Sequence, residues 1–272
     1  MKISFETALI TGSSRGLGRA TAIKLAQEGV GKIAVHYNTR RDESEKTVAQ
    51  IRAHGADGVL VQGNTSDAKR AADIVNEAAD KLGGCDIFIQ SVVPELGLIY
   101  EHTLASEVPL EKWQLAFDTQ ARAFFVGAKA AAKYMKSGGR ILAISYKPGG
   151  LTGGWQPWIG MGSAKAAMES MCRYFAVALA RNGVTVNAVS PGVSDETTLI
   201  GQTPQEVQEA LKEWGLSGWT PMRRRVAPED IANVCALLCS DEASFVTGQV
   251  IAVDGGSSLM NPDFPLALQV PK

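Results

Sequence analysis

Tyr146 and the segment 155–165 (WQPWIGMGSAK) carry the side chains of this chain that are best suited to proton chemistry. A phenol such as Tyr146 can donate a hydrogen bond and can also transfer a proton, and an ammonium such as that of Lys165 lowers the pKa of a phenol when the two are close. The indole N–H of Trp158 donates a hydrogen bond but is not a source of protons, and Met161 has no proton to give. These residue types suit a reaction in which one phenol supplies a proton and further donors stabilise negative charge on an oxygen atom.

A glycine-rich turn near the N-terminus offers a second kind of chemistry, the binding of phosphate groups. The segment TGSSRGLGRA places glycines at positions 12, 16 and 18, after an apolar run and before an amphipathic segment. Glycine lets the backbone approach a pyrophosphate closely, and the N–H groups that begin the following helix point at that anion. A purely structural turn would look similar, but this context favours a dinucleotide site. The residues expected to contact the dinucleotide here are Gly12, Ser14, Arg15, Gly16, Leu17 and Gly18.

The second apolar run indicates which dinucleotide is bound. An NAD site usually has an acidic residue near the end of this strand, where it binds the ribose 2′-hydroxyl. In IAVHYNTRRDE, Tyr37 and Asn38 stand near the place of that acid, and Arg40 and Arg41 follow. Guanidinium groups, that of Arg15 included, bind phosphate through paired hydrogen bonds, so the sequence favours the 2′-phosphate of NADP(H). The alternative is that Arg40 and Arg41 are solvated loop charges.

The elements that must position these residues alternate along the whole chain. Short apolar runs predict strands at 7–10, 32–36, 59–62, 87–89, 140–144, 185–189 and 249–253. Amphipathic segments predict helices at 18–28, 44–54, 68–82 and 164–181, among others. Strands interleaved with helices indicate an α/β fold with a parallel sheet that is covered on both faces. We expect one domain over 1–272, with irregular stretches at 91–110 and 194–219 that follow strand ends, where such sheets bind ligands.

Composition narrows the class of protein further. The chain has 272 residues, 45% of them hydrophobic, and a net charge of −1, which provides no basic surface for nucleic acid. No apolar run approaches the roughly 20 residues that span a bilayer, and the N-terminus lacks the pattern of a signal peptide. The four cysteines and three histidines do not have the spacing of metal ligands. We therefore expect a cytoplasmic protein with reduced cysteines and no metal, membrane or nucleic-acid partner.

Several segments resemble the short-chain dehydrogenase/reductase family. They are TGSSRGLG, GGRILAIS, AKAAMESMCRYFAVALA, VTVNAVSPG and the long C-terminal segment from PMRRRVAPED to VDGG. The resemblance implies a doubly wound Rossmann sheet of seven parallel strands, a nicotinamide cofactor and a homotetramer or homodimer. It also implies that Asn64 and Thr65 lie beside the adenine, that Lys165 holds the nicotinamide ribose, and that the carboxamide is contacted by Pro191, Gly192 and Val193.

The chain departs from the family pattern mainly at the active site. The family's NNAG is QSVV here, Gln120 replaces an asparagine, Tyr146 stands in place of the catalytic serine, and Met161 replaces the catalytic tyrosine. The enoyl-thioester reductase branch departs in a similar way. It has a tyrosine where Tyr146 stands, a serine-bearing segment that Ser91 and Val92 match, and a second tyrosine seven residues before the lysine. That last position is Trp158 in this chain.

The departures favour reduction of a conjugated C=C bond. Reduction of a ketone needs a positioned acid for the new alkoxide, and neither Met161 nor Trp158 can be that acid. Reduction of a C=C bond next to a thioester develops an enolate, which hydrogen bonds stabilise while a proton goes to carbon. We therefore assign Tyr146 and Lys165 catalytic roles, with Trp158 as an enolate donor. Alternatively, Tyr146 simply packs beside the cofactor, and Trp158 is an apolar wall of the substrate pocket.

The resulting hypothesis is an NADPH-dependent reductase of an enoyl-CoA or enoyl-ACP ester, including the cyclohexenylcarbonyl-CoA type. Two alternatives stay open: a carbonyl or imine reductase with Tyr146 as acid, and a catalytically silent NADP-binding protein. A substrate lid is expected at 194–219, and the tail 259–272 either covers a neighbouring active site or is disordered. The residues expected to line the substrate pocket are Trp155, Trp158, Met161 and Trp214.

Overall fold

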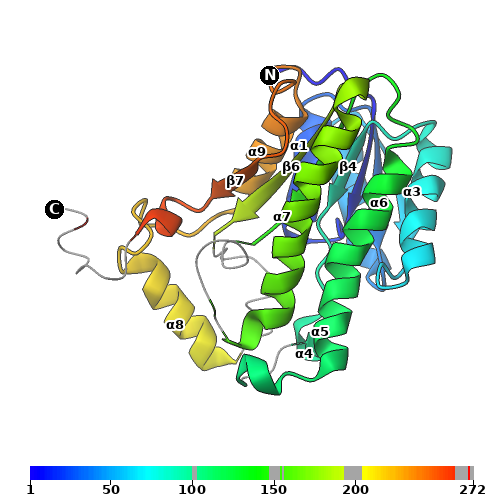
Figure 1. Cartoon of the computed structure of the whole chain (residues 1–272). Helices are drawn as coiled ribbons and strands as arrows, with labels where there is room; N and C mark the ends of the chain where they lie inside the picture. The colour runs from blue at the N-terminus through cyan, green and yellow to red at the C-terminus, as the bar shows by residue number, and fades with distance from the viewer. Residues whose placement is uncertain (100–102, 147–153, 155, 193–203, 261–268, 270–272) are drawn as a thin grey trace.

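A computed structural model describes residues 1–99, 103–146, 154, 156–192, 204–260 and 269 (Figure 1). Its centre is a sheet of seven strands. The strands are β1 Thr7–Thr11, β2 Lys32–Tyr37, β3 Asp57–Gln62, β4 Ile87–Gln90, β5 Gly139–Ile144, β6 Val184–Pro191 and β7 Val250–Val253. All seven predicted strands are present, each within two residues of its predicted ends.

The strand order is β3-β2-β1-β4-β5-β6-β7, and every pair is parallel. The chain winds outward in one direction from β1 and in the other from β4. Between these two strands lies the topological switch point, where the loops that follow them diverge and leave a crevice. The predicted doubly wound fold is confirmed.

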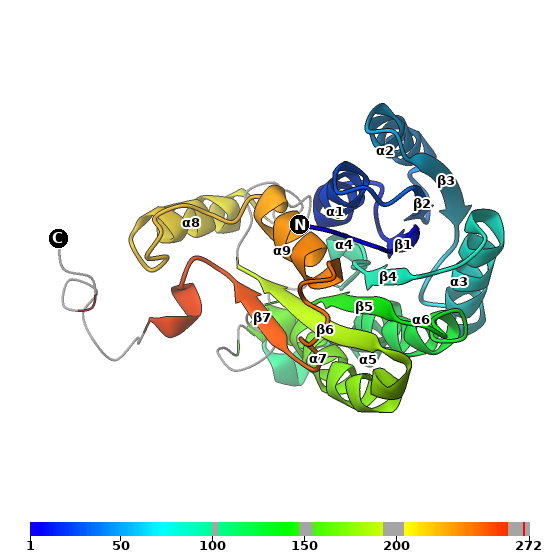
Figure 2. The ribbon, with the colours of Figure 1, turned by 90° about the horizontal axis from the view of Figure 1, so that it is seen from above.

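The helices cover both faces of this sheet (Figure 2). Their bounds are α1 Gly16–Gln27, α2 Arg41–Ala53, α3 Ala68–Leu82, α4 Leu96–Ile99, α5 Leu110–Phe117, α6 Ala123–Ala131, α7 Ile159–Leu179, α8 Gln205–Leu216 and α9 Pro228–Cys239. One face packs against α1, α2 and α9 and the other against α3, α6 and α7. In the described part of the chain, no helix is long and apolar enough to cross a bilayer.

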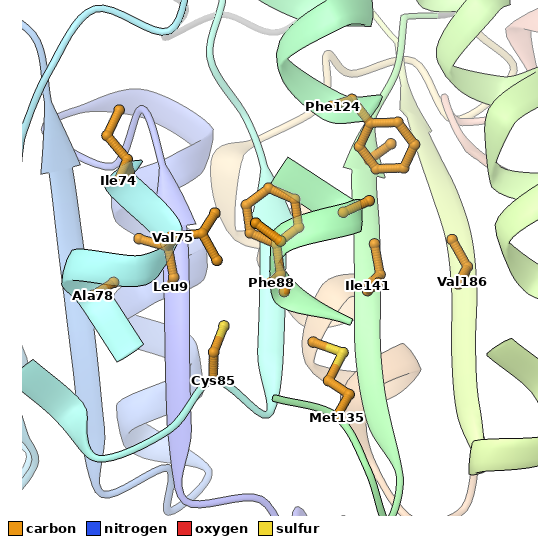
Figure 3. Packing of buried hydrophobic residues seen from close by; sticks show 14 of the residues in the cluster. Leu9, Ile74, Val75, Ala78, Cys85, Phe88, Phe124, Met135, Ile141 and Val186 are labelled. Carbon is orange, nitrogen blue, oxygen red and sulfur yellow. The ribbon is translucent and has the colours of Figure 1, made fainter. Parts of the chain in front are cut away.

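Alternating strand residues build the two apolar layers. Leu9 points to the α3–α6–α7 layer, whereas its neighbours Ala8 and Ile10 point to the other layer. Figure 3 shows Leu9, Phe88 and other residues of the first layer between the sheet and its helices. Because both faces of every central strand are buried, the strands read in the sequence as continuous apolar runs.

The helix that carries Lys165 begins earlier than the sequence predicts. We predicted 164–181, and α7 runs from Ile159 to Leu179. Its first turn contains two glycines, which are poor helix formers. A Cβ on Gly160 would lie 3.0 Å from the Cβ of Ala116. Close packing of α7 against α5 therefore selects glycine here and overrides its low helix propensity, so Met161 and Lys165 lie on one continuous helix.

Candidate active site

A cleft of about 450 Å³ opens at the carboxyl edge of the sheet, around the switch point. It receives residues from the loops after β1, β2, β3, β4, β5 and β6 and from the start of α7. Its lining includes most of the predicted site residues: Gly12, Ser14, Arg15, Gly16, Leu17, Gly18, Tyr37, Asn38, Arg40, Asn64, Thr65, Ser91, Val92, Tyr146, Trp158, Met161, Lys165, Pro191 and Gly192. Residues as far apart in the sequence as Gly12 and Gly192 thus share one cleft.

The glycine turn has the shape that its sequence predicts. Gly12 and Gly16 have φ values of +68° and +55°, in the left-handed region that favours glycine. A Cβ on Gly18 would lie 2.5 Å from the carbonyl oxygen of Gly12, so α1 can pack against the turn only with glycine at this position. The turn leads directly into α1, whose first N–H groups face the cleft.

His36 fixes this turn, a role that the sequence did not reveal. The backbone N–H of Gly12 donates to His36 Nδ1 at 3.0 Å, and Nε2 lies 3.0 Å from the carbonyl oxygen of Gly63. The first bond makes Nδ1 the acceptor, so the proton of the neutral ring sits on Nε2 and is donated to Gly63. Burial lowers the pKa of His36 to about 4, so the imidazole is neutral near pH 7 and joins β1, β2 and β3 by uncharged hydrogen bonds.

The three arginines predicted to bind phosphate are separated by the structure. Arg15 and Arg40 both line the cleft. Burial and, next, the positive charge of Arg40 lower the pKa of Arg15, so the two guanidinium groups are close enough in this cleft to repel one another, which suits the binding of an anion. Arg41 does not line the cleft. Its Nε atom donates to Glu45 Oε1 at 2.8 Å on the exposed side of α2, so the solvated alternative holds for this residue.

Lys165 lies at the inner end of the cleft. Its side chain is only 1% exposed, and Nζ donates to the carbonyl oxygen of Ile144 at 2.7 Å. Burial lowers its pKa to about 7, while the carboxylate of Glu169 acts in the opposite direction. A lysine with this pKa can hold or release a proton near neutral pH.

Tyr146 and Trp158 lie beside one another and line the same cleft as this lysine. Their ring centroids are 6.0 Å apart and the planes are tilted by 57°. Burial raises the pKa of Tyr146 to about 12. We expected Lys165 to lower this pKa, and that expectation is wrong for the structure described, because the Lys165 ammonium donates to Ile144. The phenol is therefore protonated and available as a donor at any physiological pH.

Met161 lines the cleft and contacts Gln120, which is not part of the cleft lining. Gln120 lies in the π-helical turn Asp118–Arg122 and is fully buried. Its Nε2 atom donates to the carbonyl oxygen of Ala116 at 2.9 Å and lies 3.3 Å from Met161 Sδ. Gln120 and Met161, two of the positions at which the chain departs from the family pattern, are thus in contact. Met161 joins a small apolar cluster with Ile99, Ala116 and Trp158, against which Val93, Leu115 and Tyr146 pack.

Gln90, the last residue of β4, is buried next to the cleft and forms hydrogen bonds to two neighbouring segments. Its Oε1 atom accepts from Thr11 Oγ1 at 2.8 Å, and Nε2 donates to the carbonyl oxygen of Thr119 at 3.4 Å. Thr65 Oγ1 donates to that same carbonyl at 3.4 Å, and the backbone N–H of Ser91 donates to Thr11 Oγ1 at 3.2 Å. The Gln90 side chain, which replaces the asparagine of the family pattern, therefore connects Thr11 to Thr119 by hydrogen bonds.

The remaining predicted residues lie where the structure makes no statement about their side chains. Trp155 and Val193 fall outside the described residues. Trp214 is on α8, the helix within the expected lid, and its side chain is not described. The segment 194–203 and most of the tail also lie outside the described part of the chain.

The residues of the cleft fit a nicotinamide dinucleotide. The turn at Gly12–Gly18 leaves room that a Cβ would fill, since a Cβ on Gly12 would lie 3.0 Å from the Cα of Val92. Arg15 and Arg40 are cations that can bind a phosphate, and Asn64, Thr65 and Lys165 add polar side chains to the same lining. The donor set suits a long anionic ligand with a flat ring at its inner end.

Known proteins match the chain over nearly its whole length. A family model described as Enoyl-(Acyl carrier protein) reductase matches residues 12–258. A 1-cyclohexenylcarbonyl-CoA reductase of Streptomyces collinus is 33% identical over 261 residues, which cover 95% of this chain and 89% of that protein. The 3-oxoacyl-[acyl-carrier-protein] reductase FabG of Staphylococcus aureus is 32% identical, with 92% and 97% covered.

Solved structures agree with these matches. A dehydrogenase/reductase from Sinorhizobium meliloti 1021 has a TM-score of 0.83 at 28% identity, covering 94% of this chain and 96% of that one. An acetoin dehydrogenase from Enterobacter cloacae, at 24% identity and a TM-score of 0.82, shares the fold. The sheet order, the glycine turn and these matches together show that the chain belongs to the short-chain dehydrogenase/reductase family of oxidoreductases.

Proposed function

We propose that the protein is an NADPH-dependent reductase of a C=C bond conjugated to an acyl thioester carbonyl, carried by coenzyme A or an acyl carrier protein. The observation that carries the proposal is the set of donors beside Lys165. The phenol comes from Tyr146 after β5, an indole stands at Trp158, and the first turn of α7 holds Met161, which cannot protonate an alkoxide. Two relatives are named for acyl-thioester substrates, cyclohexenylcarbonyl-CoA and 3-oxoacyl carrier protein, which supports a thioester here.

The chain's own residues would stabilise and protonate an enolate. When bound, the nicotinamide cofactor supplies a hydride to the β-carbon of the substrate. Negative charge then develops on the thioester oxygen, where the Tyr146 hydroxyl and the Trp158 N–H act as donors. Tyr146 is the group that can also transfer a proton, and Lys165 holds a proton near neutral pH. The apolar cluster around Met161 and Ile99 excludes water from this end of the cleft and suits a compact hydrocarbon or cyclic acyl group.

NADPH rather than NADH is supported by the charges at the outer end of the cleft. Tyr37 and Asn38 occupy the end of β2, where an acid would repel a 2′-phosphate. Arg15 and Arg40 both line the cleft there, and the charge of Arg40 lowers the pKa of Arg15. A phosphate placed between them would relieve the repulsion between the two guanidinium groups.

A carbonyl or imine reductase is the second candidate, because Tyr146 is protonated at neutral pH and could serve as the acid. The relative that acts on 3-oxoacyl carrier protein gives this alternative its support. An iminium substrate arrives already protonated and would also tolerate Met161. The third possibility, a silent NADP-binding protein, requires that Tyr146→Phe leave function unchanged.

Matched substrate panels test these readings. NADPH oxidation is followed with purified protein and 2-enoyl-CoA or 3-oxoacyl-CoA esters that carry the same linear and cyclic acyl groups. We expect turnover with the enoyl panel alone, and a Tyr146→Phe loss of at least about 100-fold in kcat. The Tyr134→Phe variant, which removes a hydroxyl that contacts Asn76 on the surface, is the control. Turnover with the oxoacyl panel alone would overturn the proposal, and silence in both panels with tight NADPH binding would favour the imine or silent alternative.

We also propose that the protein is a homotetramer or homodimer in the cytoplasm. Phe125 on α6 and Tyr174 and Val177 on α7 are exposed, and such apolar surface commonly marks a protein interface. The four cysteines are buried free thiols, as is common in reducing compartments. The segment 194–219, which includes α8, is proposed to close over the acyl group.

A further inference from the structure

Trp158, just before α7, and Lys165 and Glu169 on α7 contact three successive residues that begin with the last residue of β5. The ring of Trp158, which precedes the helix, packs against Tyr146, Lys165 Nζ donates to the Ile144 carbonyl, and Glu169 accepts from Ser145 Oγ. Positions 158, 165 and 169 are spaced by seven and four residues, so they follow one line along the helix. Ile144, Ser145 and Tyr146 each therefore have a contact to α7 or to the residue that precedes it.

Ser145 is tightly fixed within this arrangement. It is 3% exposed, its backbone N–H donates to the carbonyl oxygen of Val189 at 2.7 Å, and its hydroxyl donates to the Glu169 carboxylate. It also lines the cleft. Because Ser145 directly precedes Tyr146, a rotation of its backbone would move the phenol.

Glu169 is also the charged partner of Lys165. The two residues are one helical turn apart, and within the described part of the chain the Glu169 carboxylate is the charge that opposes the effect of burial on Lys165. Tyr146 is the other titratable group at this end of the cleft. On α7, Glu169 also acts on Cys172, whose other charged neighbour is Arg173. Glu169 is half-buried, so its charge is felt more strongly than that of a solvated surface carboxylate.

We propose that Glu169 is a positioning residue for the reaction: its carboxylate lies one helical turn from Lys165 on α7 and, through its hydrogen bond to Ser145, holds the end of the strand that presents Tyr146. This inference rests on the proposed function, in which Lys165 and Tyr146 contact cofactor and substrate. Glu169 itself touches neither. It deepens that function by assigning a role to a residue outside the cleft.

The test measures cofactor affinity against pH, without substrate. The NADPH dissociation constant is determined by fluorescence titration between about pH 5 and 9 for the wild type, Glu169→Gln, Glu169→Asp and Ser145→Ala. We expect wild-type affinity to fall as pH rises through about 7, where Lys165 loses its proton. In Glu169→Gln this midpoint should move down by about one pH unit, because a buried ammonium without its carboxylate releases its proton more easily.

The variants separate the charge of Glu169 from its hydrogen bond to Ser145. Ser145→Ala keeps the carboxylate, so its midpoint should stay in place, and Glu169→Asp should restore most of the midpoint by keeping the charge. Asp80→Asn, an exposed acid of α3, is the control for loss of one negative charge. An unchanged midpoint in Glu169→Gln, or a wild-type affinity that does not vary over this range, overturns the proposal. Because no substrate is used, failure of enoyl turnover does not affect this outcome.

Discussion

Met161 stands four residues before Lys165 and is buried at 3% exposure between Gln120 and Trp158. At the scale of the residue, this side chain removes one possible proton donor from the cleft. A thioether cannot protonate an alkoxide, whereas it adds apolar surface beside the two aromatic donors. The phenol that remains, Tyr146, follows the end of β5 and packs against the same apolar cluster as Met161. Proton donation and apolar enclosure are thus assigned to different elements.

Trp158→Phe tests the indole as a donor. The substitution keeps an aromatic ring but removes the N–H, so we expect kcat for an enoyl ester to fall by about 100-fold, with KM little changed. Trp113→Phe is the matched control, because the Trp113 N–H donates to Ser163 Oγ at 2.9 Å on α7 rather than into the cleft. An equal effect on kcat and KM, or none, would make Trp158 a pocket wall.

Arg40→Ala tests the phosphate site. Loss of a charge-assisted pair to the 2′-phosphate should weaken NADPH binding by about 10- to 100-fold and leave NADH binding nearly unchanged. Arg41→Ala removes the neighbouring guanidinium, which pairs with Glu45 outside the cleft, and should have little effect. Isothermal titration with both cofactors measures the difference. Equal losses in the two variants would contradict the separation that the structure shows.

His36 makes the folded state sensitive to acid. Its pKa is lowered from 6.5 to about 4 in the folded protein, so the unfolded chain binds a proton first as pH falls. Its contribution to stability is present above pH 6.5 and is lost between 6.5 and about 4, by at most about 1.4 kcal/mol per pH unit. Urea unfolding at several pH values should show this slope, and His36→Gln should lack it. His54→Gln, on an exposed histidine, should retain it.

At the scale of the element, close packing of helices against the sheet places the site residues. Gly127 on α6 is the clearest example, because a Cβ there would lie 2.6 Å from Phe88 Cζ. Phe88 is on β4, which ends at Gln90 and leads directly into the cleft. The glycine in α6 therefore sets the distance between that helix and the strand that carries the centre of the site.

Gly127→Ala should destabilise the protein by about 1–3 kcal/mol, because the buried ring must move in a close-packed layer. The midpoint and slope of urea unfolding give the free energy. Gly97→Ala, at a helical position where a Cβ meets no atom within 4 Å, should leave stability unchanged or raise it slightly. A stable Gly127→Ala variant would show that the layer can relax.

At the scale of the whole molecule, the exposed apolar surface of α6 and α7 predicts self-association. Tyr174 and Val177 are 77% and 81% exposed, on the same helix that carries Lys165. If the proposed oligomer uses this surface, Val177→Asp should reduce the mass measured by light scattering and lower activity in parallel, since a charge buried in an interface is costly. Leu104→Asp, on an exposed leucine elsewhere, is the control. A monomeric wild type would contradict the prediction.

The sequence by itself determined the fold and the main members of the site. Continuous apolar runs and the glycine turn are local patterns, and local patterns are preserved when the chain folds. For that reason all seven strands and the glycine turn could be predicted, whereas the placement of Tyr146, Trp158 and Lys165 in one cleft was predicted from the family resemblance. The start of α7 could not, because packing against Ala116 overrides the low helix propensity of its glycines.

Only the tertiary structure decided which of these residues act on one another. Arg40 and Arg41 are neighbours in sequence, yet one lines the cleft and the other pairs with Glu45. His36 meets Gly12 and Gly63, and Glu169 meets Ser145, across 24 to 27 residues. Such contacts depend on strand register and on the direction in which each side chain leaves its element. Register and side-chain direction are properties of the packed molecule and cannot be deduced from the spacing of residues along the chain.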